Sequence, residues 1–278
     1  MRDRVVSPTV RTRRTMMTVS PITSEQKQHF EKILARAKKR ARKETNPGRD
    51  GMQRLFARGG EFEEWFVAGF SRFTAKLPDY TLAKSILGGD FITAEEIMVA
   101  RPNVVYSTEQ IAKLAETIPS EDILRSLKEN GYGLMPQPPK AMSLLAIRSA
   151  KSAHLYSRTE GWYANQKFAQ NELTGTGWLA VKKTSVNGST NKNWDEQNKL
   201  LTNAEYVLNA AETSWFITIF FDVRGVRLFE KGYVRTSSLD SGGFHVLVGL
   251  FDARGLIVFN RWDSSRYDYL GLASAWKL

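Results

Sequence analysis

The chain has 278 residues, of which 42% are hydrophobic and 11% aromatic, enough to fill a packed core and to exclude disorder along the whole length. It contains no cysteine, which excludes disulfides, thiolate metal sites and a cysteine nucleophile. The net charge of +11 arises in the first fifth of the sequence, because residues 1–58 hold 16 Lys/Arg and 5 Asp/Glu and the rest holds 24 of each. A basic N-terminal region therefore precedes an electrically balanced one.

No stretch has the run of apolar residues that a membrane helix needs. The basic residues 1–22 also lack the apolar segment of a secretory signal. We therefore expect no membrane partner, a cytoplasmic location and a disordered tail over residues 1–22.

The first predicted helix begins at Thr23, where Gln26 completes a capping-box pattern, and ends before Asn46-Pro47-Gly48. One face is apolar, and the opposite face carries Lys27, Lys32, Arg36, Lys38, Lys39, Arg40 and Lys43. A second helix is expected over residues 50–58 and a third over 61–77. The spacing predicts that the third helix buries one aromatic side, made of Phe62, Trp65, Phe66, Phe70 and Phe73.

Further helices are predicted over residues 80–87 and 93–100, and two better-capped ones begin at Ser107 and Ser120. These patterns indicate a helical domain over residues 23–135. The prolines at 136, 138 and 139 interrupt the pattern, and we predict a linker over residues 136–151.

The composition changes after this point, since six of the seven tryptophans lie in the last 117 residues. Strands are predicted over residues 177–183, 244–251 and 256–262, the last two forming a hairpin. Helices are expected over residues 195–201 and most of 203–224. The fold class is α+β: a helical N-terminal region and, over residues 152–278, an α+β domain with antiparallel strands.

Motifs for enzyme chemistry are lacking. The histidines at 29, 154 and 245 occur singly, and no phosphate-binding or nucleophile motif is present. Asp252, Asp263 and Asp268 fit turns and surface better than a catalytic pair. We predict no catalytic residues, no metal site and no cofactor, although a scattered Asp/Arg/Tyr site stays open.

A polar and aromatic run, residues 263–269, follows Trp262 near the C-terminus. Mixtures of Tyr, Ser and Arg are typical of antibody-like binding surfaces, where tyrosine supplies rigid contact area. An ordinary loop before a final strand is the alternative interpretation.

The last twenty residues, FNRWDSSRYDYLGLASAWKL, resemble the C-termini of variable proteins that diversity-generating retroelements diversify. In that family a loop of variable positions precedes a constant strand, here residues 270–277, with Trp276 standing where arginine is usual. Residues 209–215 and 233–238 resemble upstream blocks of the same family. The resemblance extends to residues 52–60 and 76–96.

This resemblance implies a C-type-lectin-like domain of the formylglycine-generating-enzyme type, without that enzyme's catalytic cysteines. It implies scaffold roles for Trp262, Leu270 and Gly271, and rigid support from the hairpin 244–262 and a strand over 272–277. The partner is then an unknown ligand, a protein or other macromolecule. Its binding residues are expected to be Phe259, Asn260, Arg261, Ser264, Ser265, Tyr267, Asp268 and Tyr269.

The basic helix supports a rival hypothesis, in which the seven Lys/Arg residues of its polar face bind nucleic acid. Such binding would weaken steeply with salt, by a log-log slope of about −0.9 per phosphate contact on duplex DNA. No recognised DNA- or RNA-reading motif accompanies the helix, so a solvated amphipathic face remains the alternative.

Overall fold

The computed structural model describes residues 22–74, 79–155 and 160–278. The chain forms two compact units, Met1–Val67 and Ala68–Leu278, and each is described by itself. The second unit combines helices with two mainly antiparallel sheets, so the predicted α+β class is confirmed.

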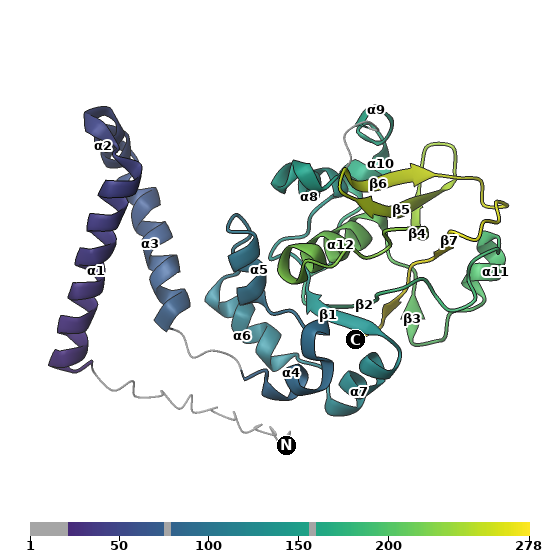
Figure 1. Cartoon of the computed structure of the whole chain (residues 1–278), viewed down its shortest axis with the longest axis horizontal. Coiled ribbons are helices and arrows are strands. Elements are labelled where there is room, and N and C mark those ends of the chain that lie inside the picture. The colour runs from purple at the N-terminus through teal and green to yellow at the C-terminus, as the bar shows by residue number, and fades with distance from the viewer. Residues whose placement is uncertain (1–21, 75–78, 156–159) are drawn as a thin grey trace, which may run out of the picture. The chain divides into compact units, whose positions relative to one another are not determined.

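The first unit is made of helices (Figure 1). Helix α1 spans Ser24–Thr45, α2 spans Gly48–Ala57, and α3 spans Gly59–Thr74 and continues into the second unit. The capping box at Thr23 is confirmed, and Asn46 ends α1 in the left-handed conformation.

The prediction that α3 buries its aromatic side is wrong for the side chains that the structure describes. Phe62, Trp65, Phe66 and Phe70 are all exposed, and Phe73 lies outside the described side chains. Amphipathic spacing shows which side of a helix is apolar, but only tertiary packing decides whether that side is covered.

The second unit begins with α4 (Thr81–Leu87), the short 3-10 helix η1 (Gly88–Asp90), α5 (Ala94–Ala100), α6 (Thr108–Glu116) and α7 (Glu121–Glu129). Thr93 and Ser107 form the capping boxes of α5 and α6. Among the later helices are α8 (Leu144–Ala150), η2 (Ser152–His154), α9 (Glu160–Tyr163), α10 (Lys167–Asn171), α11 (Trp194–Asn198) and α12 (Ala210–Arg224).

The first sheet has the order β1-β2-β8-β3 and is antiparallel throughout. Its strands are β1 (Tyr132–Pro136), β2 (Trp178–Lys182), β8 (Ala275–Trp276) and β3 (Glu205–Tyr206). The second sheet has the order β6-β5-β4-β7, in which only the β4–β7 pair is parallel. Its strands are β4 (Tyr233–Leu239), β5 (His245–Asp252), β6 (Gly255–Asn260) and β7 (Leu270–Leu272).

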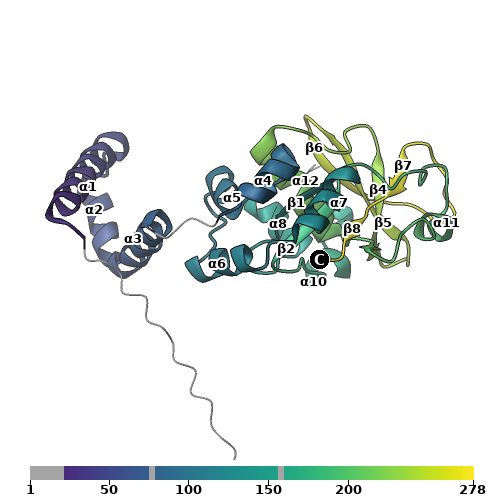
Figure 2. The same cartoon turned by 90° about the horizontal axis from the view of Figure 1, so that it is seen from below.

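Helix α12 lies between the two sheets and forms the centre of the core (Figure 1, Figure 2). Trp215, Phe216 and Phe220 are buried on it, and the Trp215 indole N–H donates to the Pro136 carbonyl at 3.1 Å. Gly133 on β1 permits this close packing, because a Cβ there would lie 2.9 Å from Phe216 Cζ. A helix buried on nearly all sides explains why its sequence shows no clear polar face.

The predicted linker over residues 136–151 is not a linker. Pro136 closes strand β1, which pairs with β2, and Leu144 and Ile147 of α8 are fully buried. Proline is compatible with β1 because this strand is at the edge of its sheet, where one row of backbone N–H groups has no strand partner.

The domain limits predicted at 23–135 and 152–278 differ from the structure for the same reason. The division falls after Val67, and α5 and α7 pack against α12 and β1 respectively. The helices after residue 80 therefore complete the core of the second unit.

The predicted hairpin is confirmed, with β5 and β6 paired through Val248 and Val258. The expected single strand over 272–277 is instead divided, because β7 belongs to the second sheet and β8 to the first. The C-terminal segment thus joins both sheets.

Candidate functional site

The predicted ligand-binding residues lie at the end of β6 and on the loop between β6 and β7, here called the 261–269 loop. Phe259 and Asn260 are half-buried at the strand end. On the loop Ser265 is half-buried, and the exposed predicted positions are Arg261, Ser264, Tyr267, Asp268 and Tyr269. The structure therefore gathers all eight on one continuous stretch with most side chains at the surface.

Some of these side chains contact one another. The rings of Tyr267 and Tyr269 stack with centroids 5.0 Å apart, and the Arg261 guanidinium lies 4.6 Å from the centroid of the Phe259 ring. The ring of Tyr233 on β4 also stacks on the Phe259 ring, with centroids 6.4 Å apart. Aromatic and arginine side chains in such contact present a large, partly ordered surface.

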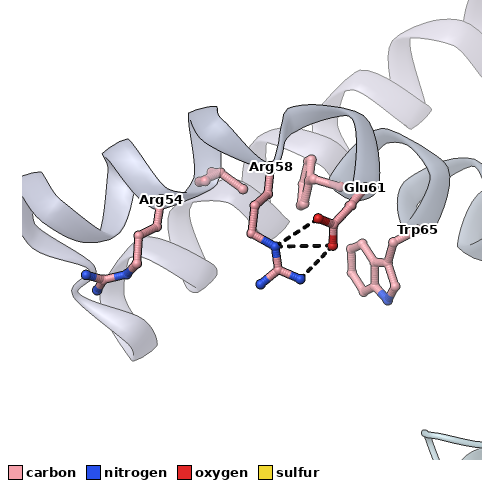
Figure 3. A pocket seen from close by; sticks show the side chains of 6 residues that line it. Arg54, Arg58, Glu61 and Trp65 are labelled. Carbon is pink, nitrogen blue, oxygen red and sulfur yellow. Dashed lines mark hydrogen bonds and ion pairs between the residues drawn. The ribbon is translucent and has the colours of Figure 1, made fainter.

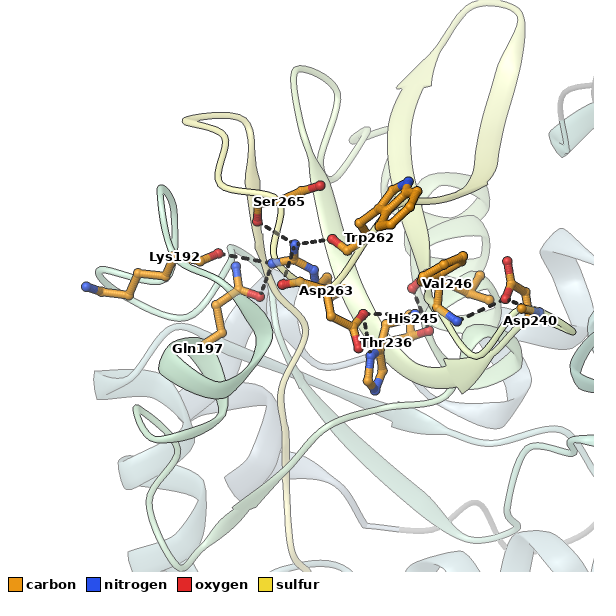
Figure 4. A network of polar contacts seen from close by, with 12 residues as sticks. Lys192, Gln197, Thr236, Asp240, His245, Val246, Trp262, Asp263 and Ser265 are labelled. Carbon is orange, nitrogen blue, oxygen red and sulfur yellow. Dashed lines mark hydrogen bonds and ion pairs between the residues drawn. The ribbon is translucent and has the colours of Figure 1, made fainter.

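A buried arginine, Arg235, contacts the backbone of the loop, and Figure 4 labels the three loop residues that it contacts, Trp262, Asp263 and Ser265. Arg235 on β4 is 0% exposed, and its Nη2 donates to the Ser265 carbonyl at 2.6 Å. The same nitrogen makes longer contacts, of 3.4 and 3.5 Å, with the carbonyls of Trp262 and Asp263. A planar guanidinium with several fixed donors suits a loop that turns its carbonyl groups inward.

The other terminal nitrogen of Arg235 binds α11 and the segment just before it. Nη1 donates to Gln197 Oε1 at 2.8 Å and to the Lys192 carbonyl at 3.1 Å. Burial lowers the pKa of Arg235, and the nearby Asp263 carboxylate opposes that shift. An arginine guanidinium still keeps its charge in proteins, so its hydrogen bonds are charge-assisted.

Gln197 continues this network and is itself fully buried. Its amide Nε2 donates to the carbonyls of Ser189, at 2.8 Å, and Leu270, at 3.1 Å. Residue 270 starts β7, so the far end of the loop is tied to the same network. Both of these Gln197 hydrogen bonds end on backbone carbonyls and not on a loop side chain.

His245 and Trp194 hold the beginning of the loop (Figure 4 shows His245 and Asp263). Asp263 Oδ1 lies 2.9 Å from His245 Nδ1 and accepts the His245 backbone N–H at 3.2 Å. The His245 ring stacks on the Trp194 ring with centroids 3.5 Å apart, and the backbone N–H of Trp194 donates to the Asp263 carbonyl at 3.0 Å. Asp263 is therefore a fixed point of the loop.

Two further contacts join the loop to the α11 region. The Asn191 N–H donates to the Tyr267 carbonyl at 2.9 Å, and Arg266 forms an ion pair with Glu196 at 2.7 Å. The latter pair is half exposed, so it contributes little to stability.

The three expected scaffold residues behave differently. Leu270 is fully buried, and Gly271 has no room for a side chain, since a Cβ there would lie 2.3 Å from Ser185 Cβ. Trp262 differs from its scaffold prediction, because its ring is 66% exposed and stacks on Phe244 at 5.2 Å. We therefore add the Trp262 ring to the candidate binding surface.

Sequence reasoning missed the anchors Arg235, Gln197, His245 and Trp194. Arg235 lies in the block 233–238 that carries the resemblance, but no periodic pattern marks an arginine as buried. The anchors are far in sequence from groups that they hold: His245 is 18 residues from Asp263, Arg235 is 38 residues from Gln197, and Gln197 is 73 residues from Leu270. Only the tertiary structure brings them together.

A second buried ionic group, the Asp222 cluster, lies within the helical part of the second unit. Asp222 of α12 binds Arg101 Nε at 2.5 Å, Lys151 Nζ at 2.6 Å and His154 Nε2 at 2.5 Å. Burial alone would raise the pKa of Asp222, but the hydrogen bonds from these three groups hold it well below its ordinary value. The cluster ties α12 to the ends of α5 and α8 and to η2.

The remaining acidic and histidine positions show no metal-like grouping. No set of three His, Cys, Asp or Glu side chains suited to a metal ion occurs among the described residues. Asp252 binds Arg254 in the β5–β6 turn, as expected for a turn residue.

In the described part of the chain, no helix has the length and apolar character that spanning a membrane requires.

The basic residues of the rival hypothesis all lie on α1, and each is exposed: Lys27, Lys32, Arg36, Lys38, Lys39, Arg40 and Lys43. Arg40 forms an ion pair with Glu44, one turn later, at 2.6 Å. The structure thus gathers these cations on one helix of the first unit, apart in sequence from the 261–269 loop.

Comparisons with protein-family models, with curated proteins and with solved structures give no match for this chain.

Proposed function

We propose that this chain is a ligand-binding protein whose specificity resides in the side chains of Phe259–Tyr269, including the Trp262 ring. The observation that carries the proposal is the contrast within the loop: exposed side chains on a backbone held by the buried Arg235. We propose binding, and not catalysis, as the role of this surface.

The anchors favour a surface whose chemistry can change. Arg235, Gln197 and Asn191 all bond to backbone carbonyls, at Ser265, Leu270 and Tyr267 respectively. Replacing an exposed loop side chain leaves these carbonyls in place. A backbone ordered before binding also reduces the entropy lost on binding.

The side chains favour a protein or another macromolecule as the ligand. Trp262, Tyr267 and Tyr269 are exposed beside Arg261, and tryptophan, tyrosine and arginine are the residues most often found at energetic centres of protein interfaces. Tyrosine adds contact area at low entropic cost, since it has only two side-chain torsions.

We further propose that the chain is a variable protein of a diversity-generating retroelement with a C-type-lectin-like scaffold. The support is the resemblance of residues 259–278, 209–215 and 233–238 to that family. The test is the DNA flanking the gene. A reverse transcriptase gene and a near-repeat of the 3′ end that differs only at adenines are expected; absence of both would contradict the retroelement origin.

The binding proposal has its own experiment. Positions 264, 267, 268 and 269 are randomised in the full chain, and the library is displayed and selected against a panel of unrelated proteins. Binders are expected whose sequences differ at these positions and whose affinity disappears on reversion. A matched library at exposed positions of the β5–β6 turn, Ala253 and Arg254, is expected to give none; equal success there would contradict a dedicated loop.

The basic helix carries the second candidate function. Seven exposed Lys/Arg side chains on α1 favour contact with a polyanion. The affinity for mixed-sequence duplex DNA is measured between roughly 50 and 200 mM salt, a range over which binding through phosphate contacts weakens steeply. Reversal of Lys38, Lys39 and Arg40 to glutamate is expected to abolish it, and binding that ignores salt or these changes would rule it out.

A further inference from the structure

An apolar groove follows the junction of α2 and α3 in the first unit (Figure 3). Its volume is about 480 Å³, and its lining is Arg54, Leu55, Arg58, Glu61, Phe62 and Trp65. Three of these residues are apolar and three are charged, and the charged three are here called the rim. We call this surface the 54–65 groove.

The groove belongs to a unit that buries little of its own apolar surface. Helices α1 and α2 have no buried residue, and the apolar side chains that line the groove are Leu55, 37% exposed, Phe62, 46% exposed, and Trp65, 70% exposed. Single exposed apolar residues are normal, but a contiguous row is typical of an interaction site. Short helices also obtain most of their stability by packing an apolar face.

The charges on the rim change sign along the groove. Arg54 and Arg58 lie at the α2 end, and Glu61 lies at the start of α3. Figure 3 shows Arg54, Arg58, Glu61 and Trp65 in this order, with Arg58 and Glu61 paired at 2.6 Å. A surface that is positive at one end and negative at the other is complementary to itself after a two-fold rotation.

We propose that the 54–65 groove binds the same groove of a second copy of this chain, in an antiparallel two-fold dimer. Trp65 of each copy then covers apolar surface of the other. Arg54 of one copy faces Glu61 of the second copy. The acidic start of α3 disfavours a polyanion or an anionic membrane surface at this groove. The dimer stands apart from the proposed loop function, although it would place two loops on one particle and raise avidity.

Sedimentation velocity of the full chain over a range of concentrations tests this inference. We expect the mass to rise toward twice that of the monomer. Trp65→Glu is expected to raise the dissociation constant by about tenfold or more, because it buries a charge in the interface. Val99→Glu is the matched control, since Val99 is 72% exposed on α5 of the second unit, and it is expected to leave the mass unchanged.

Charge exchange separates a specific dimer from general stickiness. Arg58→Glu and Glu61→Arg are each expected to weaken the dimer, and the double variant is expected to recover association, because the rim is again self-complementary. A chain that stays monomeric at all concentrations would overturn the proposal. Dimers whose dissociation constant Trp65→Glu leaves unchanged would overturn it equally.

Discussion

Two arginines of the second unit are buried to the same degree but hold different things. Arg101 is 2% exposed and binds the carboxylate of Asp222, whereas Arg235 is 0% exposed and binds backbone carbonyls of the 261–269 loop. The first arginine joins helices to one another, and the second gives a surface loop a fixed backbone. A buried and paired charge thus joins helices at one place and orders the candidate site at another.

The partners explain why the two positions should respond differently to mutation. Asp222 compensates two cations, Arg101 and Lys151, so its loss leaves uncompensated charge in the interior. Loss of Arg235 instead leaves carbonyl groups without a donor, at a loop that already touches water. The first change is expected to act on global stability and the second on local order.

The largest effect is expected for Asp222→Asn. The variant keeps the shape of the side chain but removes its charge, and the free energy of unfolding is expected to fall by about 3–5 kcal/mol. Urea denaturation followed by tryptophan fluorescence measures it. Asp252→Asn is the control, because the Asp252–Arg254 pair lies at the surface and contributes little to stability. Equal losses in the two variants would remove the distinction between the clusters.

Acid should erase the same contribution gradually. The pKa of Asp222 is lowered in the folded chain, so its contribution is fully present above the unfolded value of about 4 and is lost as the pH falls further. The difference in stability between the wild type and Asp222→Asn is expected to be constant from pH 7 to about 5 and to shrink below about 4. Denaturation midpoints across that range give the result, and a difference that does not depend on pH would contradict the assignment.

A smaller effect on stability is expected for Arg235→Lys, about 1–3 kcal/mol, since one ammonium cannot reach all the acceptors of the guanidinium. Its distinctive result is faster amide hydrogen exchange at residues 262–270, with little change in β5. Arg227→Lys is the matched control, because Arg227 also donates to a carbonyl, that of Asp252, but outside the loop. Unchanged exchange in the loop would show that Arg235 does not order it.

The smallest effects are expected at the outer face of the loop. Ser264→Ala and Asp268→Ala replace exposed side chains that take no part in the anchoring hydrogen bonds. The free energy of unfolding should therefore change by no more than about 0.5 kcal/mol. Thermal denaturation provides the measurement. A loss of about 1.5 kcal/mol or more would mean that these side chains support the scaffold and are not free to vary.

Local sequence determined the elements that depend on local chemistry. The capping boxes at Thr23 and Ser107 and the β5–β6 hairpin were predicted, because a cap or a tight turn is decided within a few residues. The absence of cysteine also excluded thiol chemistry outright. Of the exposed positions of the 261–269 loop, the sequence analysis named Arg261, Ser264, Tyr267, Asp268 and Tyr269, but it assigned Trp262 to the scaffold.

Tertiary structure alone decided what depends on distant partners. Pro136 suggested a break, yet it ends a strand at a sheet edge where proline is compatible with pairing. The aromatic side of α3 looked like core but remains exposed, since nothing in a helix's own spacing states what covers it. Arg235 gave no sign of being an anchor, because a buried cation is stable only where acceptors from other segments converge on it, and that convergence exists only in the folded chain.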